Sequence, residues 1–372
     1  MGWKAVVVRK TLRMQFIDLR SDTVTKPGVG MRQAMGRADV GEEVYREDPT
    51  AKDLEVRSAT ALGHEAGLFV PTGTMGNLIA LKTHTEPGQE VILETRSHIY
   101  NSEMGGFSAF CGLVARPVDG DATGMLSWEQ VRQSIRPPHR SRTGLVCLEN
   151  THNFAGGGVL LQSEVEVLCQ RVRESDIKVH LDGARLGNAS AASGKPLAEL
   201  AKSFDSVMFD FSKGLGAPAG AVLAGSAAFI DRARRVRKLL GGEIHQPGIL
   251  AGACLYGLEH QLPKLKEDHR RAKRLASALA TVTGIVINAD RVTTNIVVVR
   301  VDPDCNAHRL ASELRNRGVL ASTLDDGGLR FVTHLDVNDA NIDTAIEAVR
   351  DSMHAALLSV ESSKLPGVAR GN

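Results

Sequence analysis

Two charged side chains follow short apolar segments in the middle of the chain. Asp182 ends the segment VHLD, and Lys213 follows FDFS about one helix and one strand further on. In an open α/β sheet, ligands bind beyond the carboxyl ends of the strands, so we expect both side chains at one edge of one sheet. Alone, Asp182 could cap the next helix and Lys213 could be a solvated surface residue. Together they match what pyridoxal phosphate requires: a lysine that forms a Schiff base and a carboxylate for the pyridine nitrogen.

The segment LFVPTGTMGN (Leu68–Asn77) predicts an anion site. A strand leads into Thr72, Gly73 and Thr74, and a helix follows. N–H groups and hydroxyls at a helix N-terminus can bind a dianion, although the same pattern also suits an ordinary helix cap. Beside the lysine and the aspartate, this segment becomes the expected seat of the cofactor phosphate. The glycines after the lysine do not form a dinucleotide fingerprint, because they read G-x-G-x-x-x-G with a proline among them.

Three histidines were considered as functional groups. His98 ends the segment VILETRSH and could stack on an aromatic ring or relay a proton, although a lone histidine is more often structural. His139 and His152 carry the same two interpretations. The sequence contains no H-E-x-x-H motif and no tight cluster of metal-ligand residues, so we expect no catalytic metal. It also contains no G-x-S-x-G motif, which disfavours a serine hydrolase.

Seven short apolar segments are expected to form the sheet that positions these groups. Several are continuously apolar, which is typical of strands covered on both faces. Helical patterns between them, such as Asn77–His84 and Ser163–Ser175, indicate an α/β domain with a mostly parallel sheet. The expected strands are Ala66–Val70, Glu90–Leu93, Gly112–Pro117, Thr143–Leu148, Lys178–Leu181, Ser206–Phe211 and Ala221–Ala224.

The pattern changes near residue 263. We therefore expect an N-terminal extension over residues 1–16, a large domain over 17–263, a small C-terminal α+β domain over 264–359 and a tail over 360–372. The small domain should contain a charged helix, a strand, a helix, two short strands and a final helix. These elements are Lys264–Thr283, Asn295–Val301, Cys305–Arg317, Val319–Leu324, Gly328–Thr333 and Ala340–Leu357.

Composition excludes several classes of protein. The 372 residues carry a net charge of +2, which argues against binding nucleic acid or a membrane surface. Five widely spaced cysteines without C-x-x-C exclude a disulfide scaffold and a zinc ribbon, and suit a reducing compartment such as the cytoplasm. The first fifteen residues, MGWKAVVVRKTLRMQ, hold four cations and no acid. They are either an organelle-targeting segment or a simple extension.

Six segments resemble the L-threonine aldolases, which are fold-type-I pyridoxal-phosphate enzymes. This family also resembles β-eliminating lyases and one group of fungal alanine racemases. The resemblance runs from about Ile17 to about Leu357, and the combination of SKGLGAP, LDGAR and LRSDT is highly specific. The matching segments are IDLRSDTVTKP, VPTGTMGNLIAL, LENTHNFAGG, VHLDGARLGNA, SKGLGAPAG and LRFVTHLDV.

The resemblance implies cofactor-binding roles for particular residues. Lys213 would hold pyridoxal phosphate through a Schiff base, and Asp182 would pair with the pyridinium. Gly73 and Thr74 would bind the phosphate, and His98 would stack on the ring. The family's fold is a large domain with a mostly parallel sheet followed by a small C-terminal domain.

The resemblance also implies substrate-binding roles. Ser21, Arg185 and Arg330 would clamp the substrate carboxylate, which suits the fork of a guanidinium, and Arg185 would reach the cofactor as well. Tyr45 would line the pocket. His139 matches a histidine that would act on the substrate hydroxyl from a neighbouring subunit. The implied assembly is a homodimer or homotetramer with shared active sites.

Two positions depart from the family pattern. The family's G-G-G-M-R-Q reads Gly241-Gly242-Glu243-Ile244-His245-Gln246, so His245 replaces an arginine that would hold the phosphate from the partner subunit. Glu243 would disfavour a phosphate unless it turns away. Arg46 replaces a glycine, and should either force a new backbone angle or bring a guanidinium near the pocket. Both changes indicate either an altered substrate range or a reaction other than the aldolase reaction. The alternative is that they are surface substitutions without effect on function.

The leading interpretation is an aldolase that cleaves L-threonine, L-allo-threonine or a related β-hydroxy-α-amino acid to glycine and an aldehyde. An alanine racemase or a β-eliminating lyase on the same scaffold is the main alternative, because all three chemistries form a carbanion at Cα. A catalytically silent homologue is a third possibility. The intact Lys213, Asp182, Arg185 and Arg330 argue against a silent homologue.

Overall fold

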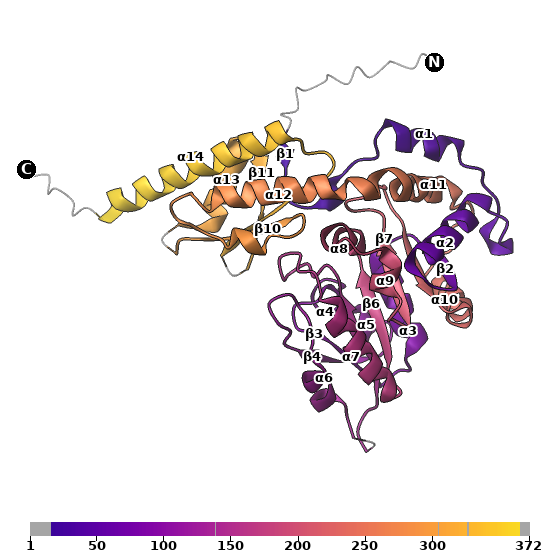
Figure 1. The fold of residues 1–372 in the computed structure, drawn as a ribbon. Helices are drawn as coiled ribbons and strands as arrows, with labels where there is room; N and C mark the ends of the chain where they lie inside the picture. Colours follow the sequence, from indigo (N-terminus) through magenta and orange to yellow (C-terminus); the bar gives the residue numbers. More distant parts are fainter. Residues whose placement is uncertain (1–15, 138, 304, 326, 365–372) are drawn as a thin grey trace, which may run out of the picture.

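The computed structural model describes residues 16–364 except 138, 304 and 326, with no side-chain description for 359–364. Its largest element is a seven-stranded sheet in the order β2-β8-β7-β6-β5-β3-β4 (Figure 1). Every neighbouring pair is parallel except the two pairs that include β8. The strands are β2 (Ala66–Val70), β3 (Glu90–Glu94), β4 (Val114–Val118), β5 (Thr143–Glu149), β6 (Lys178–Gly183), β7 (Ser206–Asp210) and β8 (Ala221–Gly225).

Helices cover both faces of this sheet. On one face α3 packs against β6, β7 and β8 with α10 beside it, and on the other face α2 and α7 contact the strands. Short 3-10 turns form η1 (Asp22–Val24) and η2 (Glu43–Tyr45). The α-helices are α1 (Val29–Arg37), α2 (Pro49–Leu62), α3 (Gly73–His84), α4 (His98–Asn101), α5 (Gly106–Ala109), α6 (Trp128–Ser134), α7 (Gln162–Glu174), α8 (Leu186–Ser193), α9 (Leu197–Ala201), α10 (Ala227–Leu239) and α11 (Gly248–Tyr256).

Helix α2 illustrates how local sequence fixes these elements. Asp48 caps its first turn by accepting a hydrogen bond from the Ala51 N–H at 2.8 Å, and Pro49 occupies the first helical position. Gly63 ends the helix with a φ of 71°, which is the left-handed conformation that favours glycine at a C-terminal cap.

All seven predicted strands of the large sheet are confirmed, with ends that shift by a residue or two. The main difference concerns β6, which continues through Asp182 to Gly183. Asp182 is therefore paired in register with Met208 of β7 and does not follow the end of the strand. Its side chain is consequently held by a rigid element, which is the best support for a precisely placed charge.

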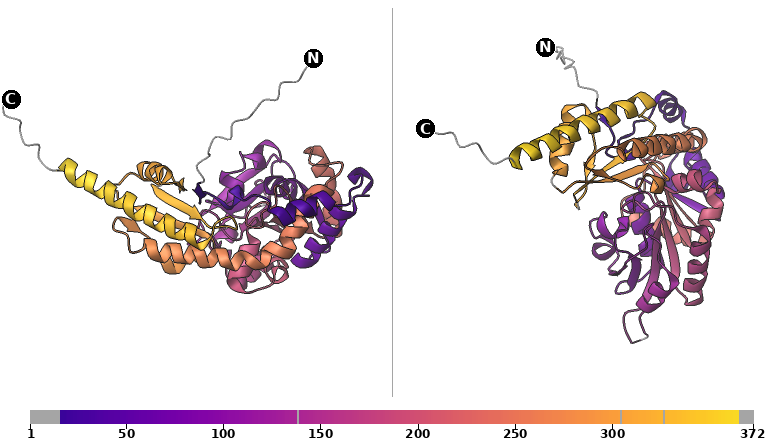
Figure 2. Two further views of the ribbon diagram at one scale, coloured as in Figure 1. Left: turned by 90° about the horizontal axis from the view of Figure 1, so that it is seen from above. Right: turned by 60° about the vertical axis from the view of Figure 1, so that its left-hand side comes forward.

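A second, antiparallel sheet in the order β12-β13-β10-β9 lies in the C-terminal part of the chain. The helices α12, α13 and α14 pack on it, and Figure 2 shows α12 and α14 running side by side. Helix α14 ends at Lys364, seven residues beyond the predicted end. The elements are η3 (Gly257–Gln261), η4 (Leu262–Lys264), α12 (Leu265–Leu279), β9 (Ile285–Val286), η5 (Ala289–Arg291), β10 (Ile296–Val301), α13 (Ala307–Asn316), β11 (Val319–Leu320), β12 (Ser322–Thr323), β13 (Gly328–Val332) and α14 (Asp339–Lys364).

The beginning of the described chain lies against this C-terminal part. Strand β1 (Ile17–Asp18) pairs in parallel with β11, and Leu19 joins the buried core of the small sheet. The residues that follow β1 are thereby brought to the junction of the two sheets. The candidate targeting segment lies outside the described residues. Among the residues that are described, no helix combines the length and apolar character needed to cross a membrane.

Candidate active site

Lys213 and Asp182 lie at the same edge of the large sheet, as the sequence predicts. Strands β6 and β7 are parallel neighbours, Asp182 is near the carboxyl end of β6, and Lys213 comes three residues after β7. The Asp182 side chain is buried, with 1% of the residue exposed. The Lys213 amine is mostly buried too, and its Nζ lies 3.6 Å from Oδ2 of Asp210.

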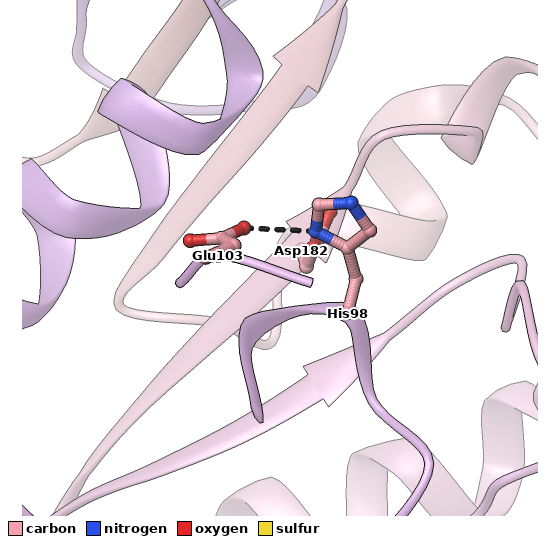
Figure 3. Close-up of side chains that lie close together, drawn as sticks. All are labelled: His98, Glu103 and Asp182. Atoms are coloured by element: carbon pink, nitrogen blue, oxygen red, sulfur yellow. Dashed lines mark hydrogen bonds and ion pairs between the residues drawn. The ribbon is translucent and has the colours of Figure 1, made fainter. Parts of the chain in front are cut away.

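Asp182 belongs to a hydrogen-bonded group that includes Asn77, Glu103 and His98. The Asn77 amide donates to Oδ2 of Asp182 at 2.9 Å and to Oε1 of Glu103 at 2.8 Å. His98 Nδ1 lies 2.9 Å from the same Glu103 oxygen, and the ring stands in front of Asp182 in Figure 3. The structure therefore brings His98 and Asp182 together, and it fixes the position of the imidazole through Glu103.

His98 and Glu103 hold a proton between them. Burial raises the pKa of Glu103, and the nearby Asp182 carboxylate raises it further. Burial alone would lower the pKa of His98, but the Glu103 hydrogen bond and the charges of Asp182 and Glu103 outweigh it and raise that pKa. The three side chains also lie close enough to hold a cation, with donor atoms within 4.8 Å of one another. However, an amide N–H already points at both carboxylates, so the group is built for hydrogen bonding.

A chain of neutral groups extends from Asn77 along the face of the sheet under α3. Asn77 donates to two carboxylates, so its Oδ1 must accept the hydrogen of His180 Nε2 at 3.1 Å. His180 Nδ1 then accepts from the Ser206 hydroxyl at 2.8 Å, and His84 Nε2 lies 2.8 Å from the same hydroxyl oxygen. Burial lowers the pKa of His180 to about 4 and that of His84 to about 3. Both rings are neutral, and the Asn77 amide is held in one orientation.

The amino end of α3 lies beside Lys213. Thr72 caps the helix by accepting a hydrogen bond from the Met75 N–H at 3.2 Å, as an N-cap threonine does. A side chain at Gly73 would come within 3.0 Å of Asp210 Oδ2 and 3.2 Å of the Met208 methyl group. Glycine at this position lets the helix end lie tightly against Asp210 and Met208. The first N–H groups of the helix have no partners within it.

Two arginines lie at the junction of the sheets and share Asn153. The Arg185 fork donates to both carboxylate oxygens of Asp22, at 2.8 and 2.7 Å, and its third nitrogen donates to Asn153 Oδ1 at 3.2 Å. Arg330 donates to that oxygen at 3.0 Å and to the carbonyl of Arg20 at 3.2 Å. The Arg330 Nε is buried and has no hydrogen-bond partner among the described residues.

The Arg185–Asp22 pair differs from the expected carboxylate clamp. Both residues are buried, and burial alone would raise the pKa of Asp22. The charge and hydrogen bonds of Arg185 hold it well below its usual range instead. These three contacts leave donor hydrogens on Arg185, so its contact with a substrate carboxylate stays a prediction. Arg330 keeps a buried donor without a partner among the described residues. Ser21 lies next to the pair, where its hydroxyl accepts from Thr23 and caps η1.

Three of the predicted site residues are exposed in the single chain. Tyr45 is 73% exposed, and His139 lies on the loop between α6 and β5, at the opposite edge of the sheet from Lys213. The side chain of His245 is 79% exposed and lies 3.0 Å from Glu42. The chain by itself does not bring these residues to Lys213, so their predicted roles require a second copy and stay predictions.

The two departures from the family pattern have local explanations. Glu243 turns toward Lys238 and Arg237 and forms ion pairs with both. Its charge is therefore balanced by these two residues, which is the case in which Glu243 would not disfavour a nearby phosphate. Arg46 has a φ of 58°, and its guanidinium reaches Asp231 on α10 at 3.5 Å. Its backbone adopts the left-handed conformation, which costs about 1 kcal/mol for a residue other than glycine. The guanidinium is held at the surface by Asp231 and is not brought near the pocket in the single chain.

Several residues that complete the site have no role predicted from the sequence. Asp22 lies inside the quoted segment IDLRSDTVTKP and Asn153 inside LENTHNFAGG, so the signal was present but no role was assigned. Asn77 could have been found, because it follows Gly73 by one helical turn on α3. Glu103 and Asp210 carry no spacing signal, and only the folded chain shows their contacts.

The chain resembles known proteins over most of its length. The family model for beta-eliminating lyases matches residues 18–302. A low-specificity L-threonine aldolase from Arabidopsis thaliana is 40% identical over 347 residues, which cover 91% of this chain and 97% of that protein. One from Escherichia coli K12 is 41% identical, covering 87% and 95%. The Leishmania major threonine aldolase structure superposes with a TM-score of 0.73 at 20% identity, covering 92% and 99%, and shows the common fold.

Proposed function

Because this chain belongs to the beta-eliminating lyase family, we propose that it is a pyridoxal-phosphate-dependent aldolase. It cleaves L-threonine, L-allo-threonine or a related β-hydroxy-α-amino acid between Cα and Cβ, and releases glycine and an aldehyde. The observation that carries this proposal is the placement of Lys213 beside the buried Asp182, at the edge of a sheet that also presents the amino end of α3.

The residues at this edge fit pyridoxal phosphate. Lys213 offers a mostly buried amine, and Asp182 offers a buried carboxylate whose charge a pyridinium would balance. The amino end of α3, at Gly73 and Thr74, supplies N–H groups for the phosphate, and the His98 ring is held where it can cover an aromatic ring. When bound, the cofactor takes up the electron pair of the breaking Cα–Cβ bond.

Arg330 is the best candidate to bind the substrate carboxylate. Its Nε is buried without a partner among the described residues, and a buried donor of this kind is costly until something accepts from it. Arg185 orients Arg330 through the shared Asn153 oxygen and keeps its own fork on Asp22. This arrangement fixes one end of the substrate, which leaves the Cα–Cβ bond as the part that can be turned into the reactive orientation.

A base must remove the hydroxyl proton of the substrate. Within one chain His98 and His180 both contact the group around Asp182, His98 through Glu103 and His180 through Asn77. The Glu103 hydrogen bond occupies Nδ1 of His98 and fixes its ring, so we assign His98 to cover the cofactor ring and assign the hydroxyl proton to His139 of a neighbouring subunit. We propose a homodimer or homotetramer in which His139, Tyr45 and His245 complete the site of the next chain.

Mixing two inactive variants tests the shared site. Lys213→Ala and His139→Ala should each be inactive alone, and a one-to-one mixture that is dissociated and reassembled should recover about a quarter of the activity, because half of all dimers are mixed and each has one intact site. No recovery from reassembled mixed oligomers would contradict the exchange of His139 between subunits.

The reaction and the lysine are tested separately. Borohydride reduction of the protein with pyridoxal phosphate, followed by peptide mass spectrometry, should label Lys213. A label on another side chain would overturn the assignment. Products are then measured from threonine diastereomers, phenylserine and alanine. We expect an aldehyde and glycine, whereas D-alanine from L-alanine would identify a racemase, and ammonia with an oxoacid would identify a β-eliminating lyase.

A further inference from the structure

Another carboxylate, Asp210, lies in the active site and has no place in the proposed mechanism. It is the last residue of β7, three positions before Lys213, and it is 7% exposed. Its Oδ1 accepts two hydrogen bonds from Ser212, from the N–H and from the hydroxyl, both at 2.7 Å. Its Oδ2 lies 3.6 Å from the Lys213 Nζ. The strand and the two Ser212 bonds together aim one carboxylate oxygen at the lysine.

Hydrogen-bond donors and the end of a helix surround the Asp210 side chain. Its Oδ2 also lies against Gly73, the first residue of the twelve-residue helix α3, where the helix dipole stabilises an anion. The two Ser212 hydrogen bonds favour the carboxylate as well. A buried anion that faces a lysine amine favours the protonated form of the lysine nitrogen.

Other charged groups face this pair, and they differ from Asp210. Asp22 is close enough to interact electrostatically with Lys213, but both of its carboxylate oxygens accept hydrogen bonds from Arg185. The His98 ring also lies within electrostatic range of Lys213, and its proton is shared with Glu103. Arg185 lies within electrostatic range of Asp210, and so does the buried thiol of Cys254. Asp210 is thus the carboxylate whose charge is directed at the lysine nitrogen.

We propose that Asp210 is a positioning residue that keeps a proton on the nitrogen of Lys213. This inference rests on the proposed role of Lys213 as the lysine that links the cofactor. The proton stays on the lysine nitrogen while Asp210 remains an anion, so no group is oxidised or reduced. The same charge repels a phosphate at the adjacent end of α3, so Asp210 also weakens phosphate binding there.

The variant Asp210→Asn keeps the shape and removes the charge. In the protein loaded with pyridoxal phosphate and without substrate, the yellow absorption band reports the proton on the lysine nitrogen. Losing an anion at this distance should move the midpoint of its pH titration down by about one pH unit or more. The matched control is Asp231→Asn, an exposed aspartate that pairs with Arg46 on the surface. It should leave the midpoint in place.

A second measurement needs no cofactor. At pH 8, reductive methylation of the cofactor-free Asp210→Asn protein should label Lys213 several-fold faster than in the wild type, because more of its amine is unprotonated. Asp210→Glu keeps the charge and should stay close to the wild type in both measurements. If Asp210→Asn does not fold, Asp210→Ser is used in its place with the same expectations.

The outcomes separate this inference from the proposed function. A titration midpoint and a labelling rate that match the wild type in the Asp210 variants would overturn the role of Asp210, even if the protein cleaves threonine and borohydride labels Lys213. If borohydride labels a different lysine, the proposed function fails first, whatever the Asp210 variants do.

Discussion

The buried and the exposed halves of the candidate site are built differently. Asp182, Asn77 and Glu103 are each at least 95% buried and share their hydrogen bonds, whereas Tyr45 and His245 are more than 70% exposed. The buried half holds the groups that must be placed accurately, the carboxylate for the pyridine nitrogen and the group that orients the histidine. The single chain therefore holds the buried half rigidly, and the proposed second chain would complete the exposed half.

The largest effect should come from breaking the buried ion pair. Asp22→Ala leaves the Arg185 guanidinium buried without its carboxylate, which should lower the free energy of unfolding by about 3–5 kcal/mol. The matched control is Asp231→Ala, which breaks the exposed pair with Arg46 and should cost less than about 1 kcal/mol. Urea unfolding measures both. Equal losses of unfolding free energy in the two variants would contradict the prediction that the buried Asp22–Arg185 pair stabilises the fold more than the exposed Asp231–Arg46 pair.

The next largest effect concerns the amide that joins the two carboxylates. Asn77→Ala removes the donor shared by Asp182 and Glu103 and should lower the free energy of unfolding by about 1–3 kcal/mol, since both acceptors stay buried. Asn101 makes two hydrogen bonds to backbone carbonyls but is exposed, so Asn101→Ala is the control and should cost less. If the two variants unfold at the same urea concentration, the buried group is not the more stabilising one.

The pH dependence of stability should also come from the buried half. His180 binds a proton in the unfolded chain below about pH 6.5, but burial lowers its pKa in the folded protein to about 4. Between these values the unfolded state binds more protons, so stability falls as the pH falls from 6.5 to 4. His180→Gln should make this slope shallower by up to about 1.4 kcal/mol per pH unit. Urea unfolding across this range measures the slope.

A variant of an exposed histidine provides the contrast for that slope. His354 is exposed on α14, so His354→Gln is the control variant whose slope between pH 6.5 and 4 is compared with that of His180→Gln. A slope that stays unchanged in His180→Gln would show that His180 titrates normally in the folded protein, contrary to its burial.

The sequence predicted the framework of the site better than its internal contacts. The strands were predicted because each is a short apolar segment, several of them continuous, and the order of strands and helices placed Asp182 and Lys213 at one edge. The partners of these residues are far apart in the chain: Asn77 is 105 residues from Asp182, and Asp22 is 163 residues from Arg185. Such pairs depend on how elements pack, which neither periodicity nor local spacing encodes.

The same limit explains the expectation for Arg185. The family resemblance implies that Arg185 binds the substrate carboxylate, a role that suits the fork of a guanidinium. Only the folded chain shows that β1 pairs with β11 and carries Asp22 to the junction of the sheets, where it occupies the fork of Arg185. The resemblance also implies that Arg330 binds the substrate carboxylate. That its Nε is buried without a partner among the described residues is seen only in the folded chain.

The smallest change in stability is expected in the exposed half, at the position where the family has an arginine. His245→Arg should change the free energy of unfolding by less than about 0.5 kcal/mol, because the side chain is solvated. It should nevertheless tighten pyridoxal phosphate binding about tenfold, since a hydrogen bond to a charged group contributes about 1.5 kcal/mol. The control His260→Arg makes the same change at another exposed histidine and should leave cofactor affinity unchanged. If both variants gain equally in a fluorescence titration, general charge attraction explains the effect. If only His245→Arg gains, the exposed half of one chain contributes to a phosphate site that the buried half alone does not complete.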